Sequence, residues 1–172
     1  MPELQQFEGW RSESTEELIA LEGKYRLDSL VGAFEEALRA KDSKVGREAL
    51  SEAELVVLTV AAFEREMKGG GYAHVFRKSS KAYAPYFVDS LDRIGCHDAA
   101  EHTQQAIYAL GIGDYLGADA IDRAMAEENE DRGFVMDACT DEYLYVADEV
   151  AGALFEYIKA NRGEIVVKGE WD

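Results

Sequence analysis

Residues 51–71 read SEAELVVLTVAAFEREMKGGG, and their order indicates a buried α-helix. Ser51 and Glu54 have the spacing of a capping box, in which each side chain accepts a hydrogen bond from the other residue's backbone N–H. Residues 56–60 have the composition of a strand, but the cap before them and the alanines and glycines after them favour a helix. Because apolar residues lie on most sides of this helix, we expect it at the centre of the core.

Amphipathic helices are predicted on both sides of this central helix. Ser14 and Glu17 form a second capping box, and the apolar residues of 27–39 recur three and four apart. Further helices are predicted at 85–94, with Gly95 as the stop, and at 98–110, 118–131 and about 140–161. We therefore predict a single compact, all-α, multi-helix domain with residues 1–45 as an N-terminal helical extension of residues 46–172. Residues 164–168 are strand-like, or equally an ordered tail.

Length and composition limit the class of protein. The chain has 172 residues, of which 47% are hydrophobic, enough for one domain with a substantial core. The longest apolar run, residues 55–63, is about half of the ~18 residues that a membrane span needs. The N-terminus lacks the features of a secretory signal, and two cysteines are too few for a disulfide framework. These features predict a cytoplasmic protein that does not contact membranes.

Charge is the strongest compositional signal. The chain has 18 basic and 35 acidic residues, a net charge of −17. Residues 1–86 contain 15 acidic and 12 basic residues, whereas residues 87–172 contain 20 and 6, a net charge of −14. A field of this sign repels nucleic acid and attracts basic partners. The alternative is an acidic surface that serves solubility and has no partner.

Motifs for catalysis or metal binding are weak. His97 and His102 are five residues apart and diverge by about 140° on a helix, so they do not share a face. Cys96 and His97 are adjacent and point in different directions. The glycines at 69–71 lack the Lys and Ser/Thr of a phosphate-binding loop. We therefore predict no enzyme, no cofactor and no metal; an enzyme built around His74, His97 or Cys96 remains an alternative.

The acidic residues near the C-terminus follow a pattern. On the predicted 140–161 helix, Glu142, Glu149 and Glu156 recur every seven residues, with carboxylates about 10 Å apart. Residues 127–131 crowd four acids at the predicted C-terminal end of the 118–131 helix, where the helix dipole opposes them. A face that serves solubility alone would intersperse lysines. We therefore predict a surface for a basic protein, comprising Glu127, Glu128, Glu130, Asp131, Asp137, Asp141, Glu142, Asp148, Glu149 and Glu156.

Residues of about 45–162 resemble a known family. After Glu64-Arg65-Glu66-Met67, residues 69–76 read GGGYAHVF, and residues 91–96 read LDRIGC. This order resembles a bacterial domain family, long catalogued as of unknown function, with a Gly-Gly-Phe-x-Gln-Tyr-Phe signature followed by Leu-x-x-Ile-Gly-Ala. The signature positions are Gly70, Gly71, Tyr72, Phe76, Leu91, Ile94 and Gly95. The chain departs from the signature with His74 at the Gln position and Val75 at the Tyr position.

The resemblance carries expectations of its own. The characterised member of that family is a DNA mimic, an all-helical acidic dimer that occupies the DNA-binding surface of a helix-turn-helix transcription regulator. The resemblance thus implies an α fold, no cofactor, a DNA-binding regulator as partner and scope for a homodimer, while the negative charge predicts no direct contact with nucleic acid. Two other readings stay open, an immunity-type inhibitor of a basic toxin or nuclease and an acidic helical domain without a mimicry role.

Overall fold

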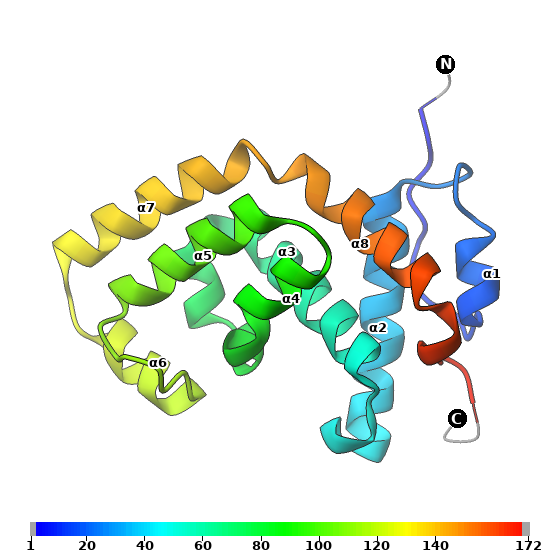
Figure 1. Ribbon diagram of the computed structural model, residues 1–172, viewed down its shortest axis with the longest axis horizontal. Coiled ribbons are helices and arrows are strands. Elements are labelled where there is room, and N and C mark those ends of the chain that lie inside the picture. Colours follow the sequence, from blue (N-terminus) through cyan, green and yellow to red (C-terminus); the bar gives the residue numbers. More distant parts are fainter. Residues whose placement is uncertain (1–2, 170–172) are drawn as a thin grey trace. The chain divides into compact units, whose positions relative to one another are not determined.

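The computed structural model describes residues 3–169, which form eight α-helices and three short 3-10 helices (Figure 1). The α-helices are α1 (Thr15–Ile19), α2 (Leu27–Val45), α3 (Glu52–Arg77), α4 (Phe87–Arg93), α5 (His97–Ala109), α6 (Ala118–Ala126), α7 (Glu130–Leu144) and α8 (Asp148–Ala160). The 3-10 helices are Arg47–Ala49, Ser79–Tyr86 and Arg162–Glu164. No strand occurs in this part of the chain, so the all-α prediction is confirmed. None of its helices is long and apolar enough to cross a membrane.

Contacts divide the described chain into two compact units. The first unit contains residues up to Ala61 together with those from Ala151 onward, and the second unit contains Ala62–Val150. The boundaries fall inside α3 and inside α8, so both helices contribute residues to both units. The acids from Glu127 to Glu149 all belong to the second unit, whereas Glu156 belongs to the first.

Both predicted capping boxes of the first unit are confirmed. The Glu17 N–H donates to Ser14 Oγ at 3.2 Å, and the Ser14 N–H donates to Glu17 Oε2 at 2.9 Å. At the start of α3, the Ser51 N–H donates to Glu54 Oε1 at 2.8 Å and the Glu54 N–H to Ser51 Oγ at 3.0 Å. Each box satisfies two backbone donors that have no partner within the helix.

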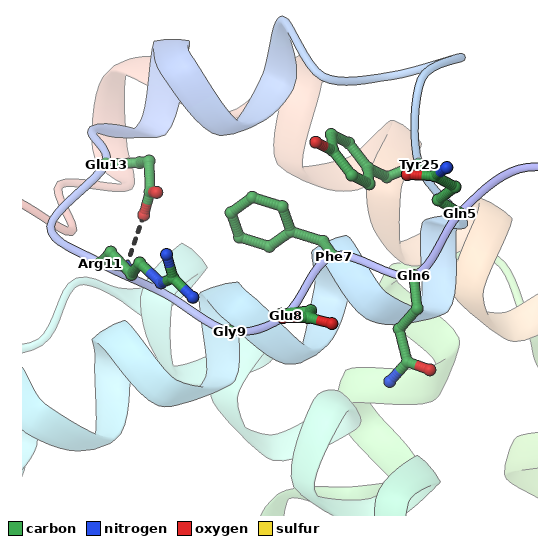
Figure 2. Close-up of a pocket in the computed structure, with 8 residues that line it drawn as sticks. All are labelled: Gln5, Gln6, Phe7, Glu8, Gly9, Arg11, Glu13 and Tyr25. Atoms are coloured by element: carbon green, nitrogen blue, oxygen red, sulfur yellow. Dashed lines mark hydrogen bonds between the residues drawn. The ribbon is translucent and has the colours of Figure 1, made fainter.

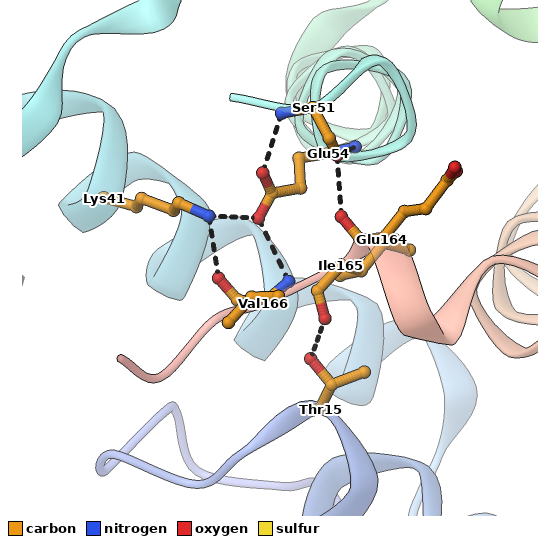
Figure 3. Close-up of polar contacts among 7 residues, drawn as sticks. All are labelled: Thr15, Lys41, Ser51, Glu54, Glu164, Ile165 and Val166. Atoms are coloured by element: carbon orange, nitrogen blue, oxygen red, sulfur yellow. Dashed lines mark hydrogen bonds and ion pairs between the residues drawn. The ribbon is translucent and has the colours of Figure 1, made fainter. Parts of the chain in front are cut away.

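Figure 3 shows how Glu54 also holds the C-terminal tail of the first unit. Its Oε2 atom lies 2.5 Å from Lys41 Nζ and accepts a hydrogen bond from the Val166 N–H at 3.1 Å, while Lys41 Nζ donates to the Val166 carbonyl at 3.0 Å. Of the two readings of residues 164–168, the structure has the ordered tail, which follows the last 3-10 helix from residue 165 onward. Ile165 and Val167 are buried and Val166 is exposed, so the alternation of a strand is present without a partner strand.

Aromatic rings fill the core of the second unit. The Phe63 ring lies 5.0 Å from that of Phe87 and 5.5 Å from that of Tyr143, and Tyr72 lies 6.0 Å from Tyr143, all between ring centroids. Tyr143 is the last buried residue of α7. These rings therefore attach α7 to α3 and α3 to α4, and α7 also contacts α5 (Figure 1).

Two predicted helices have the wrong boundaries. The 118–131 helix is two elements, because α6 ends at Ala126 and α7 begins at Glu130, with Asn129 as N-cap. The 140–161 helix is also interrupted, because α7 ends at Leu144 and α8 begins at Asp148. Leu144 is 60% exposed, although its spacing of three and seven residues from Ala147 and Ala151 would put it in the buried seam of one continuous helix. The heptad spacing continues through residues 145–147 although the helix does not, which is why periodicity suggested one helix.

Candidate acidic interaction surface

The acids at 127–131 are divided between two helix ends. Glu127 is the C-cap of α6, at a helix C-terminus as we expected, whereas Glu130 and Asp131 lie at the N-terminus of α7. Asn129 Oδ1 accepts a hydrogen bond from the Arg132 N–H at 3.0 Å and caps α7. Glu130 and Asp131 are in the first turn of α7. Since the helix dipole presents positive partial charge at this end, it stabilises each acid by about 0.3–1 kcal/mol instead of opposing it.

The stripe of Glu142, Glu149 and Glu156 on one helix is not present, because α7 ends between the first two of these residues. Glu156 also differs from the others in its contacts. Its carboxylate lies 2.7 Å from Lys159 Nζ, which is itself 3.0 Å from a carboxylate oxygen of Glu22. This ion-paired acid of the first unit is therefore left out of the candidate surface.

The other nine acids are exposed and form no ion pair with a base within residues 3–169. Between residues 127 and 150 they are accompanied by a single base, Arg132, which gives this segment a net charge of −8. Arg132 is buried, and its guanidinium donates to the Glu127 carbonyl. We call these nine residues the acidic surface: Glu127, Glu128, Glu130, Asp131, Asp137, Asp141, Glu142, Asp148 and Glu149.

Helix α7 carries five of these acids on its outward half. Its buried residues are spaced four, three and four apart and mark one side of the helix: Arg132, Met136, Cys139 and Tyr143. At 100° per residue, Glu130, Asp137 and Asp141 fall on one part of the opposite half, and Asp131 and Glu142 on another. From Glu130 to Glu142 the helix rises about 18 Å, or one carboxylate per ~4–5 Å. Each strand of duplex DNA carries one phosphate per ~3.4 Å of axis.

The family signature residues surround the point where α3 meets α7. Gly71 has φ +76°, and a Cβ atom there would lie 2.6 Å from the Thr140 side chain of α7. The Tyr72 N–H donates to Thr140 Oγ1 at 3.2 Å, and the Tyr72 hydroxyl lies 2.8 Å from Thr103 Oγ1 on α5. The Phe76 ring stacks on that of Tyr72 at 6.5 Å. These residues thus hold the helix that bears the acids.

The remaining signature residues have structural contacts too. Leu91 and Ile94 are buried in α4 and at its end, and Gly95 has φ +86°. The Cys96 N–H donates to the Leu91 carbonyl at 2.9 Å, as in a helix that a left-handed glycine terminates. His74 Nε2 lies 2.8 Å from Glu66 Oε2.

The residues considered for catalysis or metal binding, His74, His97, His102 and Cys96, do not form one cluster. His97 is exposed and its Nδ1 lies 2.9 Å from Asp92 Oδ1. A hollow of about 170 Å³ is lined by Cys96, His97 and Glu149, among others, and not by His74 or His102. In residues 3–169 no three His, Cys, Asp or Glu side chains form a group that could hold a metal ion.

Burial raises the pKa of the Cys96 thiol to about 11, and the carboxylates of Glu149 and Glu64 add to this effect. The thiolate is the reactive form, so we expect alkylation of Cys96 by iodoacetamide at pH 8 to be about 100-fold slower than that of a cysteine with an ordinary pKa. The rate should keep rising as the pH approaches 11. Cys139→Ala removes the other thiol, and mass spectrometry after timed quenching measures the rate. A rate that levels off below pH 9 would contradict the raised pKa.

A second hollow lies along the N-terminal segment of the first unit (Figure 2). It has a volume of about 290 Å³, and its lining includes the Phe7 and Tyr25 rings, edge to face at 5.3 Å, with Glu8, Arg11 and Glu13. It contains no residue of the acidic surface and neither a histidine nor a cysteine. The sequence offered no signal for this hollow.

Sequence reasoning also missed apolar residues on the exposed side of α7. Phe134 is 78% exposed and Tyr145, just after the helix, is 85% exposed. The buried seam of α7 could have revealed them, because both fall on the side opposite to it. Large apolar residues are normally assigned to the core, and this preference concealed the pattern.

Comparison with known proteins places residues 48–161 in one family. The model for DMP19-like proteins matches this range, which nearly coincides with the range of about 45–162 that carries the sequence resemblance. No curated protein and no solved structure matches the chain.

Proposed function

The chain belongs to the DMP19-like protein family, and on that basis we propose that its acidic surface binds a basic DNA-binding protein, a transcription regulator, in the place of DNA. The observation that carries this proposal is the set of five exposed carboxylates along α7, none of them ion-paired to a base within residues 3–169. Their mean axial spacing is ~4–5 Å, with single gaps from about 1.5 to 9 Å, so their linear charge density approaches that of phosphates along one DNA strand.

The mechanism would be competitive. Lys and Arg side chains that otherwise contact phosphates would pair with the carboxylates of the acidic surface, and a regulator bound in this way could not hold its operator. The net charge of −8 between residues 127 and 150 would steer a basic partner toward α7 and speed association at low salt. Such binding needs neither a cofactor nor a chemical step.

Neutralising three acids of α7 tests the proposal. We expect Asp137→Asn, Asp141→Asn and Glu142→Gln together to weaken binding of the captured partner by about tenfold, since each ion pair contributes roughly 0.2–1 kcal/mol. Partners are captured from a lysate of the source cells on the immobilised protein, identified by mass spectrometry and titrated at low and moderate salt. The matched control, Glu3→Gln with Glu8→Gln and Glu48→Gln, removes the same charge from exposed acids of the first unit and should bind within about twofold of the parent.

Competition with duplex DNA decides between mimicry and ordinary acidic binding. A DNA mimic and an operator duplex exclude one another, so the captured regulator should be displaced from its DNA as the protein is added. A regulator that binds both at once contradicts mimicry. Recovery of a nuclease whose activity the protein blocks would instead establish the immunity-type function.

A further inference from the structure

The outward side of α7 is not purely acidic. Phe134, Ala138, Asp141 and Tyr145 follow one another at spacings of four, three and four, which places them in one line opposite the buried seam. We call these four residues the α7 ridge. All four are exposed, and the two aromatic side chains stand about 16 Å apart along the helix axis. Acids flank the ridge on both sides: Glu130 and Asp137 on one, Asp131 and Glu142 on the other.

Exposed aromatic side chains in such a place need a physical reason. A surface that attracts only counter-charges gains nothing from a phenyl ring in water, because the ring orders water around it without a compensating contact. Here two large aromatic side chains lie on the same line of one helix with acids on both sides, and exposed apolar groups rimmed by polar ones are found at protein interaction sites. Aromatic residues are also enriched among those that dominate binding energy, where surrounding polar groups exclude water from them.

Charge identifies the occupant of the ridge. A second copy of this chain would bring the five carboxylates of each α7 against five others, and Arg132, the only base of α7, is buried. Like charges brought together in this way oppose association. Anionic lipid is repelled for the same reason. An occupant of the ridge must neutralise the flanking acids and cover the two rings. A basic protein can do both, because its cations pair with the acids and apolar recesses between those cations can receive the rings.

We propose that α7 docks into a basic protein surface that has apolar recesses between its Lys and Arg side chains, and that Phe134 and Tyr145, about 16 Å apart, each fill one of them. This inference rests on the proposed function and adds a property that duplex DNA does not share. The carboxylates contribute a salt-dependent share of the affinity, and the rings contribute a share that salt does not screen. A partner could thereby bind this protein more tightly than its charge alone predicts.

Two synthetic helical peptides of equal length and equal Arg content serve as probes. One carries leucines along its arginine-rich face, and the other carries glutamines at the same positions. We expect the unmodified protein to bind the leucine peptide about tenfold more tightly than the glutamine peptide. Phe134→Ala with Tyr145→Ala should abolish this preference and leave the affinity for the glutamine peptide within about twofold. Titration calorimetry measures the affinities, and circular dichroism establishes that each variant is folded.

Control variants separate the possible failures. Tyr115→Ala removes an exposed aromatic residue of the loop before α6 and should keep the preference. The triple variant of Asp137, Asp141 and Glu142 should weaken binding to both peptides. If the parent protein binds both peptides equally, the proposed role of the α7 ridge is wrong, whereas the proposed role of the acidic surface still stands. Binding to neither peptide overturns the proposed function and the ridge together. Sedimentation measures the oligomeric state of the parent and of the Phe134→Ala, Tyr145→Ala variant. If the parent is a dimer and the variant is a monomer, the ridge binds a second copy of the chain, and the inference is wrong.

Discussion

Replacing Glu54 by alanine is expected to lower the free energy of unfolding by about 3–5 kcal/mol, the range measured when one partner of a buried ion pair is removed. Glu54 is 2% exposed and Lys41 is 8% exposed at the side chain. The substitution removes the carboxylate that faces the Lys41 ammonium, the acceptor of the Val166 N–H and the acceptor of the Ser51 N–H. Since whole domains are stable by only about 5–15 kcal/mol, a large fraction of the stability should disappear.

Urea unfolding followed by circular dichroism measures this loss. The control for an exposed pair is Glu16→Ala, because Glu16 lies 3.2 Å from Arg162 in an exposed ion pair, and we expect a change within about 0.5 kcal/mol. The double substitution Lys41→Met with Glu54→Leu leaves no buried charge behind, so it should be more stable than Glu54→Ala. If Glu54→Ala changes the stability by less than about 1 kcal/mol, the pair behaves as a solvated one.

Replacing Gly71 by alanine is the second large expected effect, a loss of roughly 3 kcal/mol or more. Part of it is the backbone at φ +76° and ψ −164°, a region essentially restricted to glycine, which costs a residue with a side chain about 1–3 kcal/mol. The rest comes from the added methyl group, which would lie 2.6 Å from two atoms of Thr140. Because Thr140 belongs to α7, relief of this contact requires α7 to move away from α3.

Two matched variants divide this effect into its parts. Gly113 also has a positive φ, +66°, with nothing within 4 Å of an added Cβ, so Gly113→Ala should show the cost of a positive φ without a close contact, about 1–2 kcal/mol. Thr140→Ala removes the two closest atoms and loses the hydrogen bond from the Tyr72 N–H, for about 1 kcal/mol. In that background Gly71→Ala should cost only the backbone part, about 1–3 kcal/mol more. Equal losses with and without Thr140 would show that the contact is not the cause.

The Gly71 contact shows that the position of α7 and its proposed binding surface depend on different residues of this DMP19-like chain. The signature residues Gly71 and Tyr72 position α7, whereas the acids and rings proposed to meet a partner lie on the other side of that helix. A homologue could therefore keep the signature and the fold while its surface charges differ. A functional argument for any such protein has to be made from the residues on its α7.

Local patterns predicted the elements well where neighbouring residues suffice to make them. The capping boxes at Ser14 and Ser51 and the stop at Gly95 depend on groups within a few residues of one another, and all three are present. The all-α class follows from the same short-range rules. The exposure of the predicted acids is equally local in origin, because an unpaired carboxylate is too unfavourable to bury.

Helix boundaries that depend on distant contacts were not predictable. Residues 145–147 contain neither glycine nor proline, so nothing in the local sequence separates α7 from α8. Tyr143 is buried among Phe63 and Tyr72, while Leu144 remains exposed, and the heptad pattern alone suggested that Leu144 would be buried. The packing of Tyr143 against residues more than 70 positions away in the sequence thus determines where α7 ends, and the heptad pattern of the sequence does not.

Interactions between residues close in sequence therefore determine the helical class and the helix caps, and the excess of acids near the C-terminus is read directly from the sequence. The pairing of Lys41 with Glu54 and Val166, the contact between Gly71 and Thr140, and the exposure of Phe134 and Tyr145 arise only after folding. The physical reason is the same in each case. Hydrogen bonds within a helical turn depend on residues three or four apart, whereas burial depends on which surfaces meet when distant segments pack.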